Sequence, residues 1–205
     1  MKQYLVELIG AFFLTLAVTF TLSTPIAVGL MLMALYYVGE SVSGGYYNPA
    51  LAVAGWMRGI LPVEEMMLYT GVQSVGSFLG VALYRAITNN TYMPEMPADA
   101  SFFMAFLFEF LLVSLLALVL LTVATSKEFK GSVVNGAVIG LTLTAILYLG
   151  GLFNPAIAVG ALVYNGLFVG TAGMPNEVFG IYVVAPVVGA IVAGLMYDYM
   201  HAGKR

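Results

Sequence analysis

The sequence of 205 residues lacks cysteine, contains one histidine and carries few charges, since only 8% of its residues are Asp, Glu, Lys or Arg. The absence of cysteine excludes disulfide scaffolds, thiolate metal sites and cysteine nucleophiles. The single histidine, His201, lies near the C-terminus, so a histidine-based catalytic triad or metal cluster is not expected. The net charge of −3, with no basic patch, argues against a nucleic-acid partner.

Charges are too sparse to cover the surface of a water-soluble globule, which carries about 25% charged residues. Hydrophobic residues make up 61% of the chain, and the mean hydropathy is +0.99. Crossing a bilayer takes about 20 mostly apolar residues. The sequence therefore predicts an all-α membrane protein in which lipid is the main solvent. Six segments qualify as spans: about Tyr4–Leu22, Ile26–Val42, Met66–Arg85, Phe102–Ala124, Ser132–Leu149 and Val178–Tyr199.

The basic residues orient these spans, because cytoplasmic loops carry an excess of Lys and Arg. With a cytoplasmic N-terminus, only Arg85 falls outside, and the other cations fall inside: Lys2, Arg58, Lys127, Lys130, Lys204 and Arg205. The prediction is a multi-pass protein of the cell membrane with both termini cytoplasmic. In the longest polar connection, 86–101, Asn89 matches a glycosylation sequon, which we interpret as an ordinary polar turn.

Two further apolar stretches are too short to span. Each begins with the same tripeptide, Asn48-Pro49-Ala50 and Asn154-Pro155-Ala156, after glycines and before about ten apolar residues. Asn is a favoured N-cap and Pro is favoured at the first helical position, so both motifs predict helix starts. Ten residues at 1.5 Å each reach about 15 Å, which is half of the bilayer core. We therefore expect two half-helices that enter from opposite faces.

The duplication predicts an inverted repeat, with the first repeat at about 1–85 and the second at about 101–200. Each repeat has three spans and one half-helix, and an odd number of spans forces the repeats into opposite orientations. The expected fold is thus six transmembrane helices plus two re-entrant half-helices.

Buried carboxylates echo the repeat, with Glu7 upstream of Asn48 and Glu109 upstream of Asn154. Intramembrane carboxylates normally face the protein interior. We expect Glu7 and Glu109 to satisfy backbone groups of the two half-helix loops; the alternative is a proton relay. Glu40, at the end of the second span, is either a surface carboxylate or part of an inner vestibule.

These motifs resemble the aquaporins, of the major intrinsic protein family. The resemblance covers essentially the whole chain and includes 43–50, 69–76, 136–140 and 182–190. It implies a homotetramer in the lipid bilayer, with one pore per protomer for water and, in some members, glycerol or other small uncharged solutes. The amides of Asn48 and Asn154 would then donate hydrogen bonds into the lumen, and the positive ends of both half-helices would repel cations.

The outer constriction departs from the family pattern. Water-selective members usually have Arg directly after the second Asn-Pro-Ala, where this chain has Ile157. The matching constriction comprises Val28, Leu147, Gly151 and Ile157, and all four are uncharged. Because Val28 and Gly151 are small, we expect uncharged solutes somewhat larger than water to enter. If Leu147 and Ile157 close the passage instead, dewetting should slow water.

The sequence thus predicts a passive channel for water and small uncharged solutes such as glycerol. Two alternatives stay open: a secondary transporter with inverted repeats, and a structural membrane protein that does not conduct. No nucleophile constellation, metal cluster or cofactor loop is recognisable, so neither an enzyme nor a bound cofactor or metal is expected.

Overall fold

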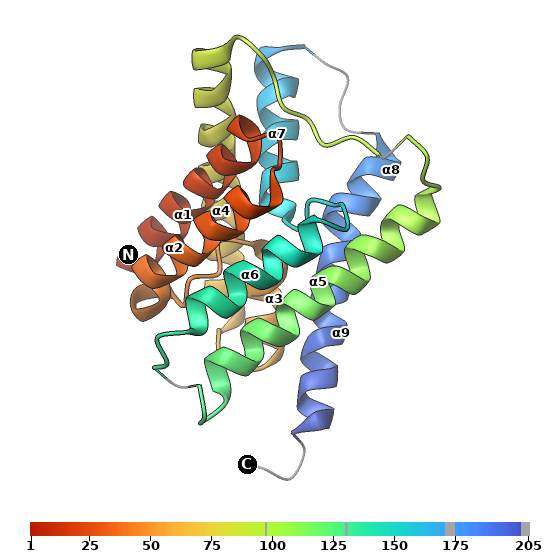
Figure 1. Ribbon diagram of the computed structural model, residues 1–205. Helices are drawn as coiled ribbons and strands as arrows, with labels where there is room; N and C mark the ends of the chain where they lie inside the picture. The colour runs from red at the N-terminus through yellow and green to blue at the C-terminus, as the bar shows by residue number, and fades with distance from the viewer. Residues whose placement is uncertain (97, 130, 171–174, 202–205) are drawn as a thin grey trace.

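The computed structural model describes residues 1–205 except 97, 130, 171–174 and 202–205. The described residues form a helical bundle (Figure 1). Its elements are α1 (Lys2–Phe20), α2 (Pro25–Ser43), α3 (Pro49–Met57), α4 (Val63–Thr88), α5 (Phe102–Thr125), α6 (Asn135–Leu147), α7 (Pro155–Phe168), α8 (Asn176–Phe179), the π-helical η1 (Gly180–Val184) and α9 (Ala185–Met200). This confirms the all-α membrane fold expected from the sequence.

Five helical segments of the described chain are long and apolar enough to cross a membrane: α1, α2, α4, α5 and the continuous α8–η1–α9 segment, Asn176–Met200. The fifth expected span is shorter than the sequence suggests. Helix α6 has 13 residues, which reach about 20 Å. Gly131 and Gly150, with φ of 71° and 98°, flank it in left-handed backbone that a helix cannot continue through.

The last span widens into η1 directly before Pro186, the second residue of α9. Proline has no N–H to donate, so the preceding turn cannot complete the usual α-helical bonding pattern. A π-helical turn absorbs this mismatch and lets the helix continue.

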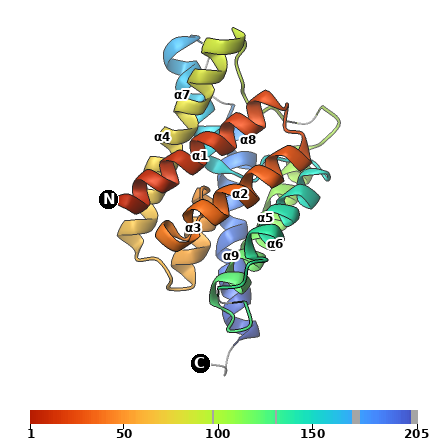
Figure 2. The same cartoon turned by 60° about the vertical axis from the view of Figure 1, so that its left-hand side comes forward.

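The two repeats pack in the same way (Figures 1 and 2), since α1 lies on α4 and α5 lies on α9. A Cβ atom at Gly76 of α4 would lie 2.2 Å from the carbonyl oxygen of Leu8, and one at Gly189 of α9 would lie 2.4 Å from that of Phe110. Leu8 and Phe110 directly follow Glu7 and Glu109 in the sequence. Glycine thus allows equivalent close approaches in both repeats, as membrane helix packing requires.

Helices α2 and α6 cross at a second pair of glycines. A Cβ atom at Gly29 would lie 2.5 Å from the carbonyl oxygen of Gly140, and a Cβ atom at Gly140 would lie 2.5 Å from the carbonyl oxygen of Gly29. This contact joins the two repeats, because each contributes its second span.

The polar connection between α4 and α5 is tied to the second repeat. Asn165 of α7 donates to the carbonyl oxygen of Tyr92 at 2.9 Å, and the Tyr182 hydroxyl donates to that of Glu95 at 2.7 Å. Asn89 is exposed and caps the end of α4 with φ of 59°, a conformation that asparagine tolerates.

Candidate functional site

Both Asn-Pro-Ala motifs start helices, α3 and α7. The Oδ1 atom of Asn48 accepts a hydrogen bond from the N–H of Ala50 at 2.9 Å, and Oδ1 of Asn154 accepts one from Ala156 at 3.0 Å. Proline occupies the first turn of each helix. Helix α3 has nine residues, close to the expected half-span, whereas α7 is longer with 14.

The two asparagine amides bind reciprocally to the opposite loop. Nδ2 of Asn48 donates to the carbonyl oxygen of Phe153 at 2.7 Å, and Nδ2 of Asn154 donates to that of Tyr47 at 3.0 Å. An amide has two N–H donors, so each asparagine uses one to hold the half-helices end to end. The family resemblance assigns these amides to the lumen, whereas in the structure one N–H group of each amide joins the two loops.

A buried carboxylate lies behind each loop. Glu7 accepts hydrogen bonds from the backbone N–H groups of Tyr46 and Tyr47 at 3.0 and 2.6 Å, and from the side chains of Ser43 and Gln73 at 2.6 and 2.8 Å. Its side chain is 0% exposed. These four donors use the carboxylate fully, in the position expected for a loop support.

Glu109 makes the equivalent contacts in the second repeat. It accepts from the N–H groups of Leu152 at 2.6 Å and Phe153 at 2.9 Å, and it is 1% exposed. Side-chain donors join the set at Glu7, whereas no side-chain hydrogen bond is recorded at Glu109 within the described residues. The first loop is therefore bound more extensively than the second.

The residue before each asparagine has a strained backbone. Tyr47 has φ of 51° and Phe153 has φ of 59°, a region that bulky residues rarely adopt. Such conformations persist only when surrounding contacts enforce them. Here the N–H groups of Tyr47 and Phe153 are the ones that Glu7 and Glu109 bind. The carboxylates thus hold the turn that aims each asparagine at the opposite loop.

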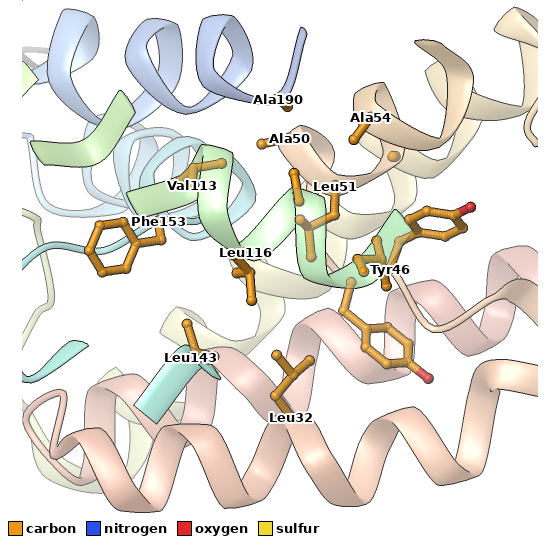
Figure 3. Close-up of a cluster of buried hydrophobic side chains, with 14 of the residues drawn as sticks. Leu32, Tyr46, Ala50, Leu51, Ala54, Val113, Leu116, Leu143, Phe153 and Ala190 are labelled. Atoms are coloured by element: carbon orange, nitrogen blue, oxygen red, sulfur yellow. The ribbon is translucent and has the colours of Figure 1, made fainter. Parts of the chain in front are cut away.

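Asn48 and Asn154 border one buried cavity of about 10 Å³, which holds about one water molecule. Apart from the two asparagines and Tyr46, the side chains that line this cavity are apolar. Leu32, Leu116 and Leu143 converge on this space from three different helices (Figure 3). The remaining lining comes from Leu14, Val18, Val28, Tyr46, Leu51, Leu152, Phe153 and Ile157.

The structure places the four residues of the predicted constriction differently. Val28 and Ile157 border the cavity, whereas Leu147 and Gly151 are absent from its described lining. Gly151 borders another pocket, beside Glu109. On α6, Leu143 borders the cavity, whereas Leu147, one helical turn later, is the last residue of the helix.

The cavity beside the asparagines is accordingly small. The expectation of a wide opening rested on two small residues, and one of them, Gly151, does not contribute to the cavity. Leucines at 116, 143 and 152 contribute instead. A periodic register along α6 could have indicated Leu143, but the position of Leu116 depends on how α5 packs.

Glu40 is exposed at the end of α2 and does not belong to the described lining of the asparagine cavity. Its backbone carbonyl accepts the N–H of Gly44 at the helix end. The placement agrees with the surface interpretation of this carboxylate.

Two asparagine-capped half-helices that meet inside a bundle of membrane-length helices define an inverted-repeat membrane protein. The model of the family described as "Major intrinsic protein" matches residues 1–197, and the chain belongs to this family. It is a family of channels rather than of enzymes.

Several named relatives are similar to the chain. "Nodulin-26" of Glycine max is 30% identical over 177 residues, which cover 83% of this chain and 62% of that protein. "Glycerol uptake facilitator protein-like 6" of Lactiplantibacillus plantarum is 25% identical over 94% of this chain and 95% of that protein. "Probable aquaporin AqpM" of Archaeoglobus fulgidus is 30% identical over 85% of this chain and 74% of its own length. The chain thus spans about three fifths of nodulin-26 and nearly all of the bacterial relative.

Among solved structures, the aquaglyceroporin from Plasmodium falciparum superposes with a TM-score of 0.82 over 98% of this chain and 96% of that chain, at 20% sequence identity. This likeness establishes the fold.

Proposed function

We propose that the chain forms a passive channel for water and small uncharged solutes. The observation that carries the proposal is the reciprocal pair of Asn48 and Asn154, whose amides and half-helix starts meet at a water-sized cavity. The roles of both Asn-Pro-Ala motifs as the pore centre are part of this proposal. Relatives named aquaporin and glycerol uptake facilitator support the same class of permeant.

The cavity chemistry favours neutral permeants over ions. An ion that enters must lose most of its hydration, and an apolar wall returns almost none of that free energy. Two helix N-terminal ends add positive potential at the asparagines, which opposes cations further. We assign Val28, Leu143 and Ile157 as the constriction, and water as the permeant that best matches its size.

The two glutamates support a pore rather than a proton relay. Glu7 and Glu109 each accept two backbone N–H groups of a loop, and Glu7 also accepts from the side chains of Ser43 and Gln73. Neither borders the asparagine cavity among the described residues. A coupled transporter would need a carboxylate that meets its substrate, so the channel is the better fit.

The assembly and orientation belong to the proposal as well. Arg58, Lys127 and His201 border one pocket and so lie at one end of the bundle. The excess of basic residues assigns that end, with both termini, to the cytoplasmic side of the cell membrane. We expect a homotetramer with one pore per chain, which the mass of the detergent-solubilised complex will check.

Stopped-flow light scattering of proteoliposomes tests the function. We expect osmotic shrinkage faster than in empty liposomes, with a low activation energy and no saturation, and a smaller glycerol flux. Potassium and proton fluxes should equal those of empty liposomes. Saturable flux that depends on an ion gradient would establish the transporter, and water flux equal to that of empty liposomes would establish the non-conducting protein.

A further inference from the structure

A second pocket, separate from the asparagine cavity, lies where α3, α5 and α9 end together. It has a volume of about 310 Å³, within the range of small-molecule sites. Arg58 follows α3, Thr125 ends α5, and Tyr197 and His201 come from the end of α9. We call it the inner pocket. It shares no described lining residue with the asparagine cavity.

Arg58 is held in this pocket, and one of its N–H donors has no partner among the described residues. Its guanidinium lies 5.5 Å from the centre of the Tyr197 ring, and Nη1 lies 3.5 Å from Oδ1 of Asp198. Its Nε atom is buried and has no hydrogen-bond partner within the described part of the chain. Guanidinium groups carry five N–H donors and stay charged, so the buried Nε leaves one donor for an acceptor beyond the described residues.

The wall beside Arg58 is rigid and rich in donors. Tyr197 is 2% exposed, and its hydroxyl oxygen lies 2.7 Å from Oγ1 of Thr125. The ring of His201 stacks on Tyr197 with centroids 4.0 Å apart. The Tyr197 ring thus contacts both the Arg58 guanidinium and the His201 imidazole and holds them on the same side of the pocket.

The hydrogen-bond donors of the lining suit an anion. Arg58 and Lys127 contribute N–H donors and two positive charges. They share this region with two carboxylates, Asp198 beside Arg58 and Glu128, which accepts a hydrogen bond from the Ser126 hydroxyl. Several donors around one space match a phosphate group, which presents three or more acceptor oxygens.

We propose that the inner pocket binds a phosphate group, carried by an anionic lipid of the adjacent leaflet or free in solution. Basic pockets between helices on the cytoplasmic side are suited to lipid headgroups. Its position at the helix ends is the depth at which a lipid presents its phosphate. The proposal stands independently of what passes through the asparagine cavity.

Thermal unfolding of the full chain in detergent tests this site. Dioctanoyl phosphatidic acid, dioctanoyl phosphatidylcholine and inorganic phosphate are titrated separately at constant ionic strength. We expect phosphatidic acid to raise Tm along a saturable curve, as a ligand of the folded state does. A rise with phosphate as well assigns the site to the phosphate alone, and a rise with phosphatidic acid only assigns it to the lipid.

Variants locate the effect. Arg58→Gln should weaken the apparent affinity about tenfold, because it removes a charge-assisted hydrogen bond. Lys127→Gln should weaken it by about two- to threefold and leaves the Arg58–Asp198 pair intact, so it serves where Arg58→Gln fails to fold. Lys2→Gln, an exposed cation on α1, is the control and should bind like the wild type. Equal Tm shifts with phosphatidylcholine and phosphatidic acid, or an unchanged affinity in Lys127→Gln, would overturn the proposal.

Discussion

Replacing Glu7 by alanine should destabilise the fold more than replacing Glu109, although the two residues occupy equivalent positions. Glu7→Ala leaves the N–H groups of Tyr46 and Tyr47 and the amide of Gln73 without an acceptor. The Ser43 hydroxyl can turn to the carbonyl oxygen of Gly39, 3.4 Å away. A buried orphaned donor costs about 1–3 kcal/mol, so three cost about 3–9 kcal/mol.

Glu109→Ala orphans only the N–H groups of Leu152 and Phe153, at a cost of about 2–6 kcal/mol. The difference of one donor predicts that Glu7→Ala is less stable than Glu109→Ala by about 1–3 kcal/mol. Glutamine at either position keeps one acceptor oxygen but turns an NH₂ group toward a donor, so each Gln variant should fall between wild type and alanine.

Reversible unfolding in mixed micelles, followed by circular dichroism against denaturant, gives the free energies of unfolding of the wild type and of the four variants. The asymmetry is the informative result, because a purely volume-dependent effect would make both alanine variants equal. Equal losses, or a larger loss at Glu109, would show that the hydrogen bonds to Glu7 do not hold the first loop.

Three further substitutions probe α4 by the same unfolding measurement. Gly76→Ala should lower the free energy of unfolding by about 1–3 kcal/mol, because the new Cβ would lie 2.2 Å from the backbone oxygen of Leu8. Gly71→Ala, whose Cβ would meet nothing within 4 Å, should raise it by about 0.5–1 kcal/mol. Equal effects would contradict the close packing of α1 on α4. Gln73→Met should change the free energy of unfolding by no more than about 1 kcal/mol. The hydrogen bond lost to Glu7 is offset by removal of the buried Oε1 atom, which has no partner among the described residues. A loss above about 3 kcal/mol would show that Oε1 does have a partner.

The sequence predicts the parts of this protein that depend on short-range rules. Asn48 and Asn154 cap helices because asparagine and proline favour a helix start wherever they occur in this order. The long spans follow from apolar run length alone. The duplication of one motif then implies the inverted arrangement, since an odd number of spans separates equivalent points.

Side-chain register in the cavity follows from tertiary packing, and there the sequence is a weaker guide. The family pattern placed Leu147 in the constriction, but α6 ends at that residue and Leu143 borders the asparagine cavity. Leu116 belongs to a helix that is apolar on all sides, so no periodicity marks its cavity face. The inner pocket could not be predicted from the sequence either, because Arg58, Thr125 and His201 meet only after three helices have packed.

The register of α6 also decides which leucine limits permeation. Leu143 and Leu147 are 5% and 7% exposed and lie one turn apart on the same helix, yet only Leu143 borders the asparagine cavity among the described residues. Leu143→Ala should enlarge a space that now holds about one water molecule, so that a second can follow in hydrogen-bond contact. One added hydrogen bond contributes about 0.5–1.5 kcal/mol, which predicts a rise of about two- to tenfold in osmotic water permeability per channel.

Leu147→Ala is the matched control, since it removes the same atoms from the same helix at nearly the same burial. Its free energy of unfolding should fall by a similar amount, about 2–5 kcal/mol, while its water permeability per channel stays at the wild-type value. Stopped-flow measurements normalised to the protein in each liposome separate permeability from expression. If water permeability rose in Leu147→Ala and not in Leu143→Ala, the constriction would lie at Leu147, as the sequence predicts, because the residue whose removal opens the pore must be the one that narrows it.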